Sequence, residues 1–423
     1  MPKNSTDALT RDPRPVRAAR GGLLVVPLLG PAMVAGVAYL DPGNVAANMT
    51  AGAAFGYLLV WVVVTGNVMA WLIQYLSAKL GIVTGQSLPE ALGNRFRSRP
   101  ARYGYWLQAE GVAMATDVAE VIGGAVALYL LFDLPLIVGG LITGVVSMLL
   151  LVVQSERGAK PFERVITGLM LVIAVGFCAG LVIGPPDPAE AAAGLVPMFD
   201  GADSVLLAAS ILGATVMPHA IYAHSALTRD RFGLVEAGVE RRLVLRATKV
   251  DVTIALAIAG TVNVVILLLA AANLEGVEGT DSLEGAHAAL GAALGEPVAL
   301  LFAIGLLASG LASTSVGAYA GAEIMRGLLR VNIPLLVRRA ITIAPALLLL
   351  IIGVDPTLAL VLSQVVLSFG IPFALIPLVR LTADRALMGS AVNARLTTAL
   401  AIIAAGLLIA LNVTLLVLVA TGA

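Results

Sequence analysis

Charged residues are scarce in this sequence. They make up 12% of the 423 residues, whereas soluble globular proteins carry roughly 25%, and 59% of the residues are hydrophobic. The mean hydropathy of +0.97 excludes an ordinary soluble protein and indicates an integral membrane protein that is embedded in the lipid bilayer. The 26 basic and 26 acidic residues balance, so the chain has no overall positive field, and we expect no nucleic-acid partner.

Cysteine and histidine are also rare. The single cysteine, Cys178, cannot form an internal disulfide and gives no indication of the redox compartment. Only three histidines are present, and no two are four residues apart, so the paired-histidine motif of a membrane-embedded metalloenzyme is missing. We therefore expect a protein that is not an enzyme and needs no cofactor. No feature of the sequence indicates an obligatory protein partner.

Long apolar runs, by contrast, fill the chain. A helix needs about 20 apolar residues to cross the hydrocarbon core. Runs of this kind predict an all-α integral membrane protein with eleven transmembrane helices. The runs lie near residues 23–54, 56–78, 104–131, 134–153, 163–184, 204–228, 250–274, 298–322, 335–353, 357–379 and 397–420.

The lysines and arginines are confined to alternate sides of these runs. They occur in the first twenty residues and around the loops after the second, fourth, sixth, eighth and tenth runs, whereas the other loops carry only acidic residues. Because basic residues remain on the cytoplasmic side, residues 1–22 are predicted to form a cytoplasmic tail and the carboxyl terminus to lie outside. The outer loops contain no Asn-x-Ser/Thr sequence, which favours a bacterial plasma membrane.

Two runs are interrupted at equivalent positions. The first contains Asp41-Pro42-Gly43-Asn44, and the sixth contains Met217-Pro218-His219. Proline and glycine break a helix and free backbone groups, which is costly in lipid unless the break lines a cavity. Breaks that stand five spans apart are typical of transporters built from inverted repeats. The sequence thus predicts two inverted five-helix repeats, 23–184 and 204–379, with 397–420 as an additional eleventh helix.

The breaks place an unusual set of side chains at membrane depth. Asp41 is costly there, which favours a functional role, although an aspartate before Pro-Gly can also cap the following half-helix. Asn44 offers an amide oxygen, or satisfies the broken backbone. Met217 offers a soft thioether, or simply packs. A carboxylate, an amide and a thioether together suit manganese or iron better than magnesium or calcium. The residues alone leave an organic-cation or amino-acid site open.

These two signatures resemble those of the Nramp divalent-metal/proton symporters. The resemblance covers nearly the whole chain and extends to the Thr116-Asp117-Val118-Ala119-Glu120 stretch. It implies the fold of the bacterial leucine transporters, and it implies manganese and ferrous iron as substrates, often with cadmium or cobalt. Related magnesium and aluminium carriers differ at the methionine position, so Met217 argues against them.

The same resemblance implies a set of metal ligands. It makes Asp41, Asn44 and Met217 side-chain ligands, and in some states it adds the backbone carbonyls of Ala38 and Ala214. Gln364 would join these ligands when the site is occluded. Gln74 would lie close to the site.

Three carboxylates in the third run offer a route for protons. Glu110, Asp117 and Glu120 share one helical face, where their mutual repulsion requires protonation or pairing. They could equally form structural salt bridges with Arg338 and Arg339, and both interpretations can hold together. His219 follows Met217 closely and titrates near physiological pH, or it fills space beside the break. The Nramp resemblance links His219 with Asp41, Asp117 and Glu120 in proton movement.

Two other transporter classes compete with this interpretation. A sodium-coupled amino-acid carrier of the same fold would typically present small residues and backbone amides to a substrate carboxylate, which Asp41 would repel. A channel would need a ring of pore-lining groups, and none is evident. The sequence therefore favours a symporter that moves a divalent metal ion together with protons.

Overall fold

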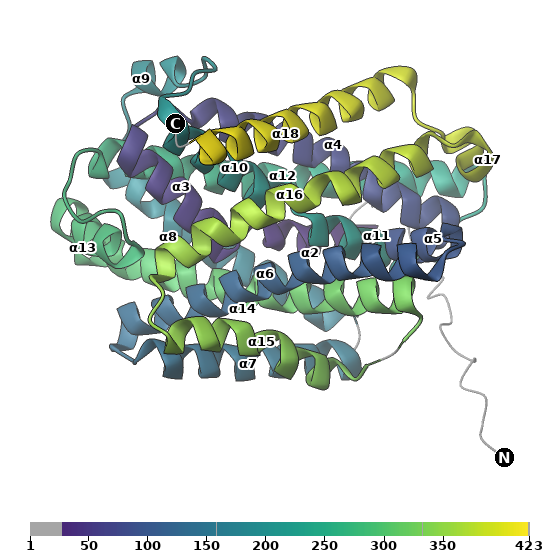
Figure 1. The fold of residues 1–423 in the computed structure, drawn as a ribbon, viewed down its shortest axis with the longest axis horizontal. Helices are drawn as coiled ribbons and strands as arrows, with labels where there is room; N and C mark the ends of the chain where they lie inside the picture. Colours follow the sequence, from purple (N-terminus) through teal and green to yellow (C-terminus); the bar gives the residue numbers. More distant parts are fainter. Residues whose placement is uncertain (1–27, 158, 332, 422–423) are drawn as a thin grey trace.

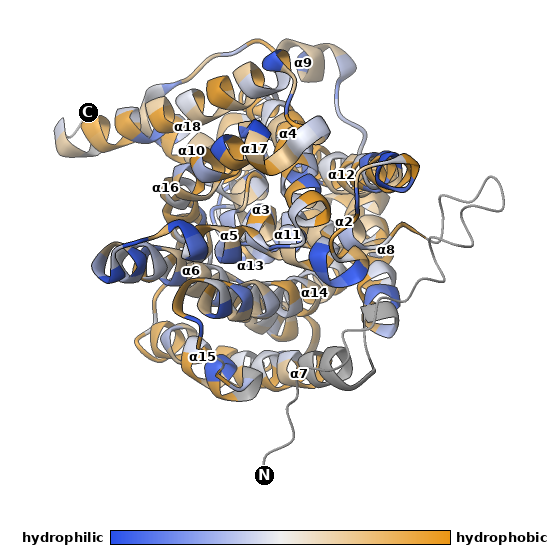
Figure 2. Ribbon diagram, turned by 90° about the vertical axis from the view of Figure 1, so that its right-hand side faces the viewer, coloured by the Kyte–Doolittle hydropathy of each residue, from blue (hydrophilic) through white to orange (hydrophobic). Residues whose placement is uncertain are grey.

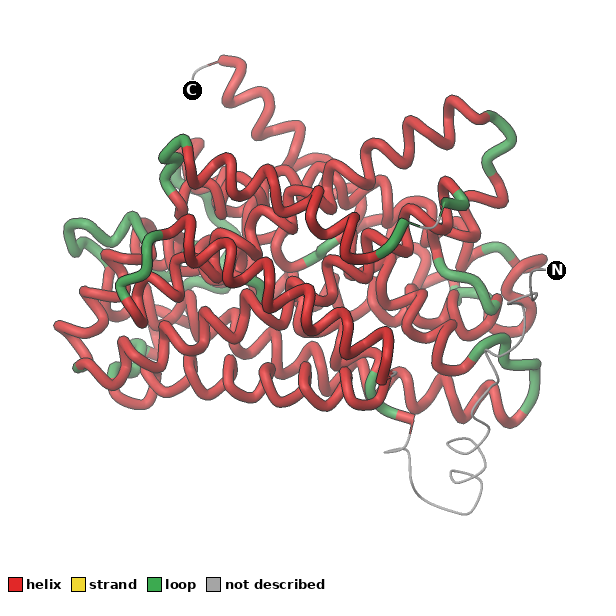
Figure 3. The backbone as a smooth tube through the Cα atoms, turned by 90° about the horizontal axis from the view of Figure 1, so that it is seen from below, coloured by secondary structure: helices red, strands yellow, loops and turns green. Residues whose placement is uncertain are grey.

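The computed structural model describes residues 28–157, 159–331 and 333–421 (Figure 1). Among these residues, all regular structure is helical (Figure 3). The predicted tail, 1–22, and the start of the first run lie outside the described residues. The helices are α2 (Pro31–Val37), the 3-10 helix η2 (Ala38–Leu40), α3 (Pro42–Phe55), α4 (Val60–Thr84), α5 (Leu88–Arg95), α6 (Arg99–Phe132), α7 (Leu136–Arg157), α8 (Ala159–Ile183), α9 (Pro188–Ala193), α10 (Gly201–Thr215), α11 (Pro218–Phe232), α12 (Val239–Leu274), α13 (Leu283–Leu294), α14 (Glu296–Leu329), α15 (Leu335–Ile351), α16 (Pro356–Ala383), α17 (Arg385–Met388), the 3-10 helix η3 (Gly389–Ala391) and α18 (Arg395–Thr421).

Long apolar helices dominate this fold. Within the described part of the chain, 8 segments are long and apolar enough to cross a membrane. The three other predicted spans correspond to the α2–α3 segment, to α7 and to α15. The prediction of an all-helical integral membrane protein is confirmed, whereas the number eleven stays a prediction. The short helices α5, α9, α13 and α17 lie at the two ends of the bundle (Figure 1) and were not predicted.

The outer helices expose apolar side chains around the bundle. Leu141 of α7, Leu171 of α8 and Leu407 of α18 are each half exposed or more. Figure 2 looks along the bundle from the end that carries α5 and α17, and hydrophilic residues gather on the helix ends that face the viewer. Since a soluble monomer does not expose so many large apolar side chains, this surface fits a lipid environment.

Both predicted interruptions occur in the middle of the bundle. The first separates η2 from α3 at Asp41, and the second separates α10 from α11 at Val216 and Met217. Asp41 and Met217 are each the N-cap of the following half-helix, and a proline follows each at the first helical position. Proline disfavours helical geometry in the preceding residue, which explains the extended backbone of both. The half-helices pair across the breaks, α2 with α11 and α3 with α10.

Helix α16 packs very closely against the broken helices. A Cβ atom at Gly213 of α10 would overlap the carbonyl oxygen of Gln364 and would lie 2.9 Å from the backbone nitrogen of Ser368. On the other side, a Cβ atom at Gly123 of α6 would overlap the ring of Pro42. Glycine at these two positions therefore lets α16 and α6 approach the broken helices closely.

The Gly213 contact leads to a test of the packing. We expect Gly213→Ala to lower the free energy of unfolding by about 1 kcal/mol or more, because the added methyl group meets backbone atoms that cannot turn away. Thermal unfolding in detergent measures the effect. Gly168→Ala is the matched control, since a Cβ atom there has no neighbour within 4 Å. Equal unfolding temperatures for the two variants would contradict the proposed contact.

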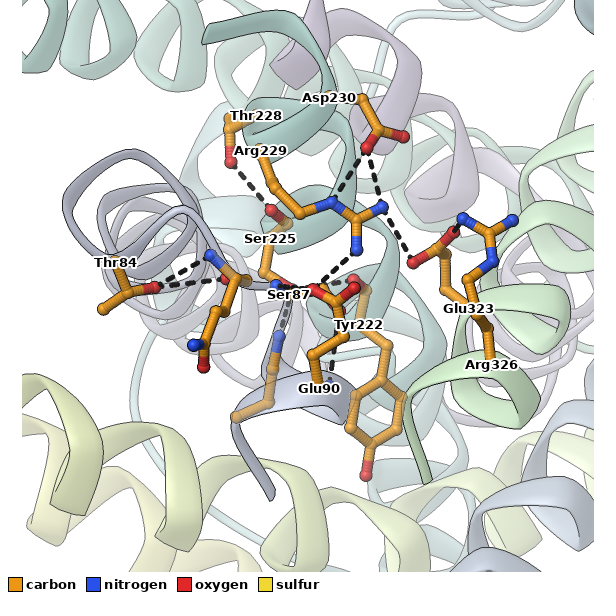
Figure 4. A network of polar contacts seen from close by, with 12 residues as sticks. Thr84, Ser87, Glu90, Tyr222, Ser225, Thr228, Arg229, Asp230, Glu323 and Arg326 are labelled. Carbon is orange, nitrogen blue, oxygen red and sulfur yellow. Dashed lines mark hydrogen bonds and ion pairs between the residues drawn. The ribbon is translucent and has the colours of Figure 1, made fainter. Parts of the chain in front are cut away.

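A polar network closes the end of the bundle that carries α5 (Figure 4). Arg229 of α11 forms ion pairs with Glu90 of α5 at 2.7 Å and with Glu323 of α14 at 3.0 Å. Burial of the Glu90 carboxyl opposes its ionisation, but the hydrogen bond and charge of Arg229 outweigh this and hold its pKa below the ordinary value. In this structure the network ties α11 to the two helices beside it.

Candidate functional site

Asp41 lies at the first break and is buried. Its Oδ1 accepts a hydrogen bond from the backbone N–H of Asn44 at 2.8 Å, as an N-cap side chain does. Its Oδ2 accepts from Nε2 of Gln364 at 3.0 Å. Because each carboxylate oxygen has two lone pairs, both oxygens retain the capacity to bind a cation. Capping and ligation are therefore compatible roles for Asp41.

Asn44 bridges the two broken helices. Its Nδ2 donates to the carbonyl oxygen of Tyr39 and to that of Ala214, each at 2.8 Å. The carbonyl of Ala214 is one of the predicted backbone ligands, and in this structure the amide of Asn44 holds it. The structure thus brings Asp41, Asn44, Ala214 and Gln364 together around the breaks.

The remaining predicted ligands are buried at the same breaks. Met217 caps α11 at the position that Asp41 occupies for α3, and its side chain has no exposed surface. Ala38 begins η2 and is likewise fully buried. The Oε1 atom of Gln364 is buried and accepts no hydrogen bond. An unsatisfied oxygen beside a carboxylate is a suitable additional donor for a cation.

Two residues that the sequence analysis missed, Asn263 and Ser309, satisfy the freed backbone. Tyr39 carries a carbonyl that also accepts from Nδ2 of Asn263 at 3.0 Å, and the hydroxyl of Ser309 donates to the carbonyl of Leu40. Asn263 interrupts a long apolar run of α12, and this signal could have identified it. Ser309 stands among small residues in α14 and gives no comparable signal.

The site is closed to solvent on both sides in this structure. Asp41 is 1% exposed, and Asn44, Met217 and Gln364 have no exposed surface. On the side away from α5, a cavity of about 410 Å³ lies between α3, α10 and α16. Val361 of α16, one helical turn before Gln364, lines this cavity. Three aspartates also line it, namely Asp203, Asp281 and Asp355.

His219 begins a polar path from the second break into α6. Its Nδ1 is 3.1 Å from the hydroxyl oxygen of Thr116, and that hydroxyl donates to the carbonyl of Val112 at 3.2 Å. When Thr116 donates to Val112, Nδ1 of a neutral His219 donates to Thr116, and Nε2, which is buried and without a hydrogen-bond partner, carries the lone pair. This arrangement leaves one nitrogen able to accept a proton.

Gln74 and His224 form a second polar contact beside the first break. Nε2 of Gln74 donates to the hydroxyl of Tyr39 at 2.5 Å, and Oε1 of Gln74 is 2.7 Å from Nδ1 of His224. Gln74, which the sequence analysis expects near the site, therefore contacts Tyr39, two residues before Asp41 at the first break. His287, the third histidine, lies far along the chain in α13, where its ring contacts Phe302.

The carboxylates of α6 pair with arginines of α15. Arg338 donates to Glu110 at 2.6 Å, and Arg339 forms a buried ion pair with Asp117. Arg339 also donates to Ser147 at 2.9 Å and to Thr314. The salt-bridge network that the sequence left open is therefore present. Whether protons also move along it is a separate matter of function.

Glu120 differs from the other two acids of α6. It is fully buried, and neither carboxyl oxygen has a hydrogen-bond partner. A Cβ atom at Gly317 of α14 would lie 2.9 and 3.0 Å from these oxygens, so the carboxyl group faces the surface of α14. A carboxyl group buried at this depth without a hydrogen-bond partner is costly, which makes Glu120 a candidate for function.

The donor set limits the chemistry of the site. Within residues 28–157, 159–331 and 333–421, no three His, Cys, Asp or Glu side chains are grouped so that they could hold a metal ion. A metal at the breaks would have to use one carboxylate together with amide, carbonyl and thioether donors. This mixed set matches a transition-metal dication that is bound and released, and it lacks the four firm ligands of a structural zinc site.

Comparisons with known proteins identify relatives of this chain along nearly its whole length. The Nramp family profile, described as natural resistance-associated macrophage protein-like, matches residues 32–418. A protein of Mycobacterium tuberculosis named divalent metal cation transporter MntH is 61% identical over 395 residues, which cover 93% of this chain and 92% of that protein.

Solved structures extend the likeness to the fold. A manganese transporter of Eremococcus coleocola superposes with a TM-score of 0.81 at 31% identity, covering 90% of this chain and 84% of that one. The nucleobase-cation-symport-1 family transporter MHP1 superposes with a TM-score of 0.60 at 15% identity, covering 83% and 77% of the two chains, so it shares the fold alone. On the sequence match along nearly its whole length and on this superposition, the chain belongs to the Nramp family.

Proposed function

We propose that this chain is a carrier that imports divalent transition metals, foremost manganese and ferrous iron and also cadmium and cobalt, together with protons. The observation that carries the proposal is the convergence of Asp41, Asn44, Gln364 and the Ala214 carbonyl at two helix breaks, with Met217 capping the second. The names of the Mycobacterium and Eremococcus relatives support a metal as the substrate. The chain would act as a transporter in the bacterial plasma membrane, with its amino terminus inside and its carboxyl terminus outside.

The metal would reach the site from the cavity between α3, α10 and α16. Its three aspartates raise the local concentration of cations. At the breaks, the dication would bind Asp41, Asn44 and Met217, with Ala38 and Ala214 contributing carbonyls in some states. For Gln364 to ligate, its amide would turn so that Oε1 and no longer Nε2 faces Asp41. The hydrogen bond between them would then be replaced by shared coordination.

Alternating access then requires the two ends to open in turn. In this structure the Arg229 ion pairs close the end that carries α5, so inward release would require their separation. In transporters with inverted repeats, one repeat or bundle moves against the other around the fixed site between the half-helices. The division into repeats 23–184 and 204–379, followed by 397–420, remains part of this proposal.

A proton would leave the site by way of His219 and α6. The dication would repel a proton from Asp41, or from a His219 ring that is protonated on Nε2, and Asp117 and Glu120 would carry it onward. Glu120 supplies an unpaired carboxyl group, while Arg339 holds Asp117 in place. Glu110 and Arg338 would continue the path toward the end that carries α5.

The role of His219 has a direct test. In proteoliposomes we expect His219→Ala to reduce the protons moved per manganese ion to about half or less, because the acceptor nitrogen beside the metal is removed. Internal pH and manganese uptake are measured together. His287→Ala, far from the breaks, is the control and should keep the ratio of the wild type. If His219→Ala retained full metal-coupled acidification, the histidine would have no part in proton transfer.

A further inference from the structure

A second cavity lies on the lipid-facing side of the bundle, apart from the breaks. It separates α16 from α18 toward the end that carries α5, and its volume is about 410 Å³. Apart from one arginine and one threonine, its lining is apolar. We call it the α16–α18 groove, and its walls include Ile376, Val379 and Arg380 of α16 and Thr398, Ile402 and Gly406 of α18.

Both walls of the groove belong to membrane-spanning helices. Segments Pro356–Ala383 and Arg395–Leu418 are long and apolar enough to cross the bilayer. Ile402 is 59% exposed and Ile409 is 40% exposed, so the groove opens toward lipid. A Cβ atom at Gly406 would meet no atom within 4 Å, and the missing side chain keeps the groove open. The surrounding medium therefore supplies hydrocarbon chains as the natural occupant.

The groove ends beside a positive charge. Arg380 is exposed, and no carboxylate in the described part of the chain pairs with it. The loop beyond it adds Arg385 and Arg395 and a single acid, Asp384. That acid is already engaged, because Arg95 donates to it at 2.8 Å and holds its pKa below the ordinary value. This end of the α16–α18 pair thus presents net positive charge at the membrane surface.

An apolar groove that ends at an arginine fits a lipid with a negative headgroup. Basic pockets between helices on the cytoplasmic side recognise such headgroups. We propose that the α16–α18 groove binds one anionic glycerophospholipid, whose acyl chain lies between the two helices and whose phosphate contacts Arg380. The hydroxyl of Thr398 lines the groove from α18 and supplies a second donor. Under the orientation proposed above, this lipid belongs to the inner leaflet.

The position of the groove links lipid binding to the helix that contacts the breaks. Farther along, α18 is joined to α16 by two hydrogen bonds between Asn412 and Ser368, at 2.8 and 2.9 Å. Between that junction and the membrane surface, the groove lies between α16 and α18. An acyl chain there would complete the packing of the helix that carries Gln364.

Lipid titration with native mass spectrometry tests the site without any transport assay. The purified full chain is titrated with palmitoyl-oleoyl phosphatidylglycerol and with the zwitterionic phosphatidylcholine of the same chains. We expect one phosphatidylglycerol to bind preferentially, and Arg380→Gln to reduce that preference about fivefold, as the loss of about 1 kcal/mol per basic residue implies. Arg97→Gln, an exposed arginine of the loop between α5 and α6, should keep the preference.

A second variant separates the groove from simple charge attraction. Gly406→Leu places a side chain in the groove and should weaken the binding of both lipids equally. The thermal unfolding temperature shows that this variant stays folded. The proposal is overturned if Arg380→Gln keeps the wild-type preference, if Arg97→Gln loses it equally, or if Gly406→Leu binds both lipids as the wild type does. Displacement of the lipid by millimolar inorganic phosphate would also overturn it, since that result indicates a site for free anions.

Discussion

Replacing Asp41 with asparagine is expected to reduce manganese uptake more than about 100-fold, because the site loses its only acidic side chain. Asparagine has nearly the same shape, and its Oδ1 can still accept from the N–H of Asn44, so the cap of α3 persists. The charge that attracts and holds the dication is lost. Uptake into proteoliposomes and manganese binding by calorimetry measure the two consequences.

Asp187→Asn provides the matched control. Asp187 caps α9 through a 2.7 Å hydrogen bond from the N–H of Ala189, so the same substitution tests the loss of a capping charge away from the breaks. We expect it to retain uptake within about threefold, since asparagine caps helices as well as aspartate does. If Asp41→Asn transported manganese as well as this control does, Asp41 would be a cap and not a ligand.

Replacing Met217 with alanine is expected to lower the preference for manganese over calcium on the order of 100-fold. This is the upper end of the loss in metal affinity that follows when a group supporting a metal site is removed. The thioether is a soft donor that contributes to manganese and little to calcium, which prefers oxygen ligands. The space that alanine leaves also admits a water molecule, which suits the larger coordination number of calcium. Competition of calcium with manganese uptake measures the preference.

A cavity effect must be separated from the loss of the sulfur donor. Met49 is also buried and lies in α3, away from the ends of the half-helices, so Met49→Ala creates a comparable cavity without removing a predicted ligand. It should leave the metal preference unchanged even where it lowers stability. An unchanged preference in Met217→Ala, or an equal loss in Met49→Ala, would show that sulfur does not select the metal.

The breaks were predictable from the sequence because their cause is local. Proline fixes its own backbone angle and restricts the preceding residue, so Asp41-Pro42 and Met217-Pro218 indicate two extended residues at the starts of two half-helices. The structure has both at those positions. The apolar runs could equally be predicted from the sequence, since each helix in lipid must satisfy its own backbone polar groups.

Contacts between distant segments were not predictable in the same way. The hydrogen bonds from Asn44 to the carbonyl of Ala214 and from Gln364 to Asp41 join residues 170 and 323 positions apart. Which group donates there depends on how the helices pack and not on any local pattern. The ion pair of Arg229 with Glu90 has the same origin, because neither residue lies in a signature motif.

The pairing of the α6 acids was open in the sequence for a related reason. Spacing places Glu110, Asp117 and Glu120 on one face of a helix but says nothing of the helix opposite. The structure pairs the first two with arginines of α15, whereas the carboxyl group of Glu120 forms no ion pair in the described part of the chain and lies against Gly317 of α14. That difference is the reason for the proposal that Glu120 exchanges a proton.

The central claim is that the chain moves a transition-metal dication and protons together through the two breaks. Its most direct test is the uptake of manganese and calcium by wild-type proteoliposomes at acidic external pH, with internal pH recorded in the same vesicles. We expect manganese uptake accompanied by internal acidification, and little uptake of calcium. Manganese uptake without acidification would contradict proton coupling, and equal uptake of calcium, or no uptake of either ion, would contradict the metal site itself.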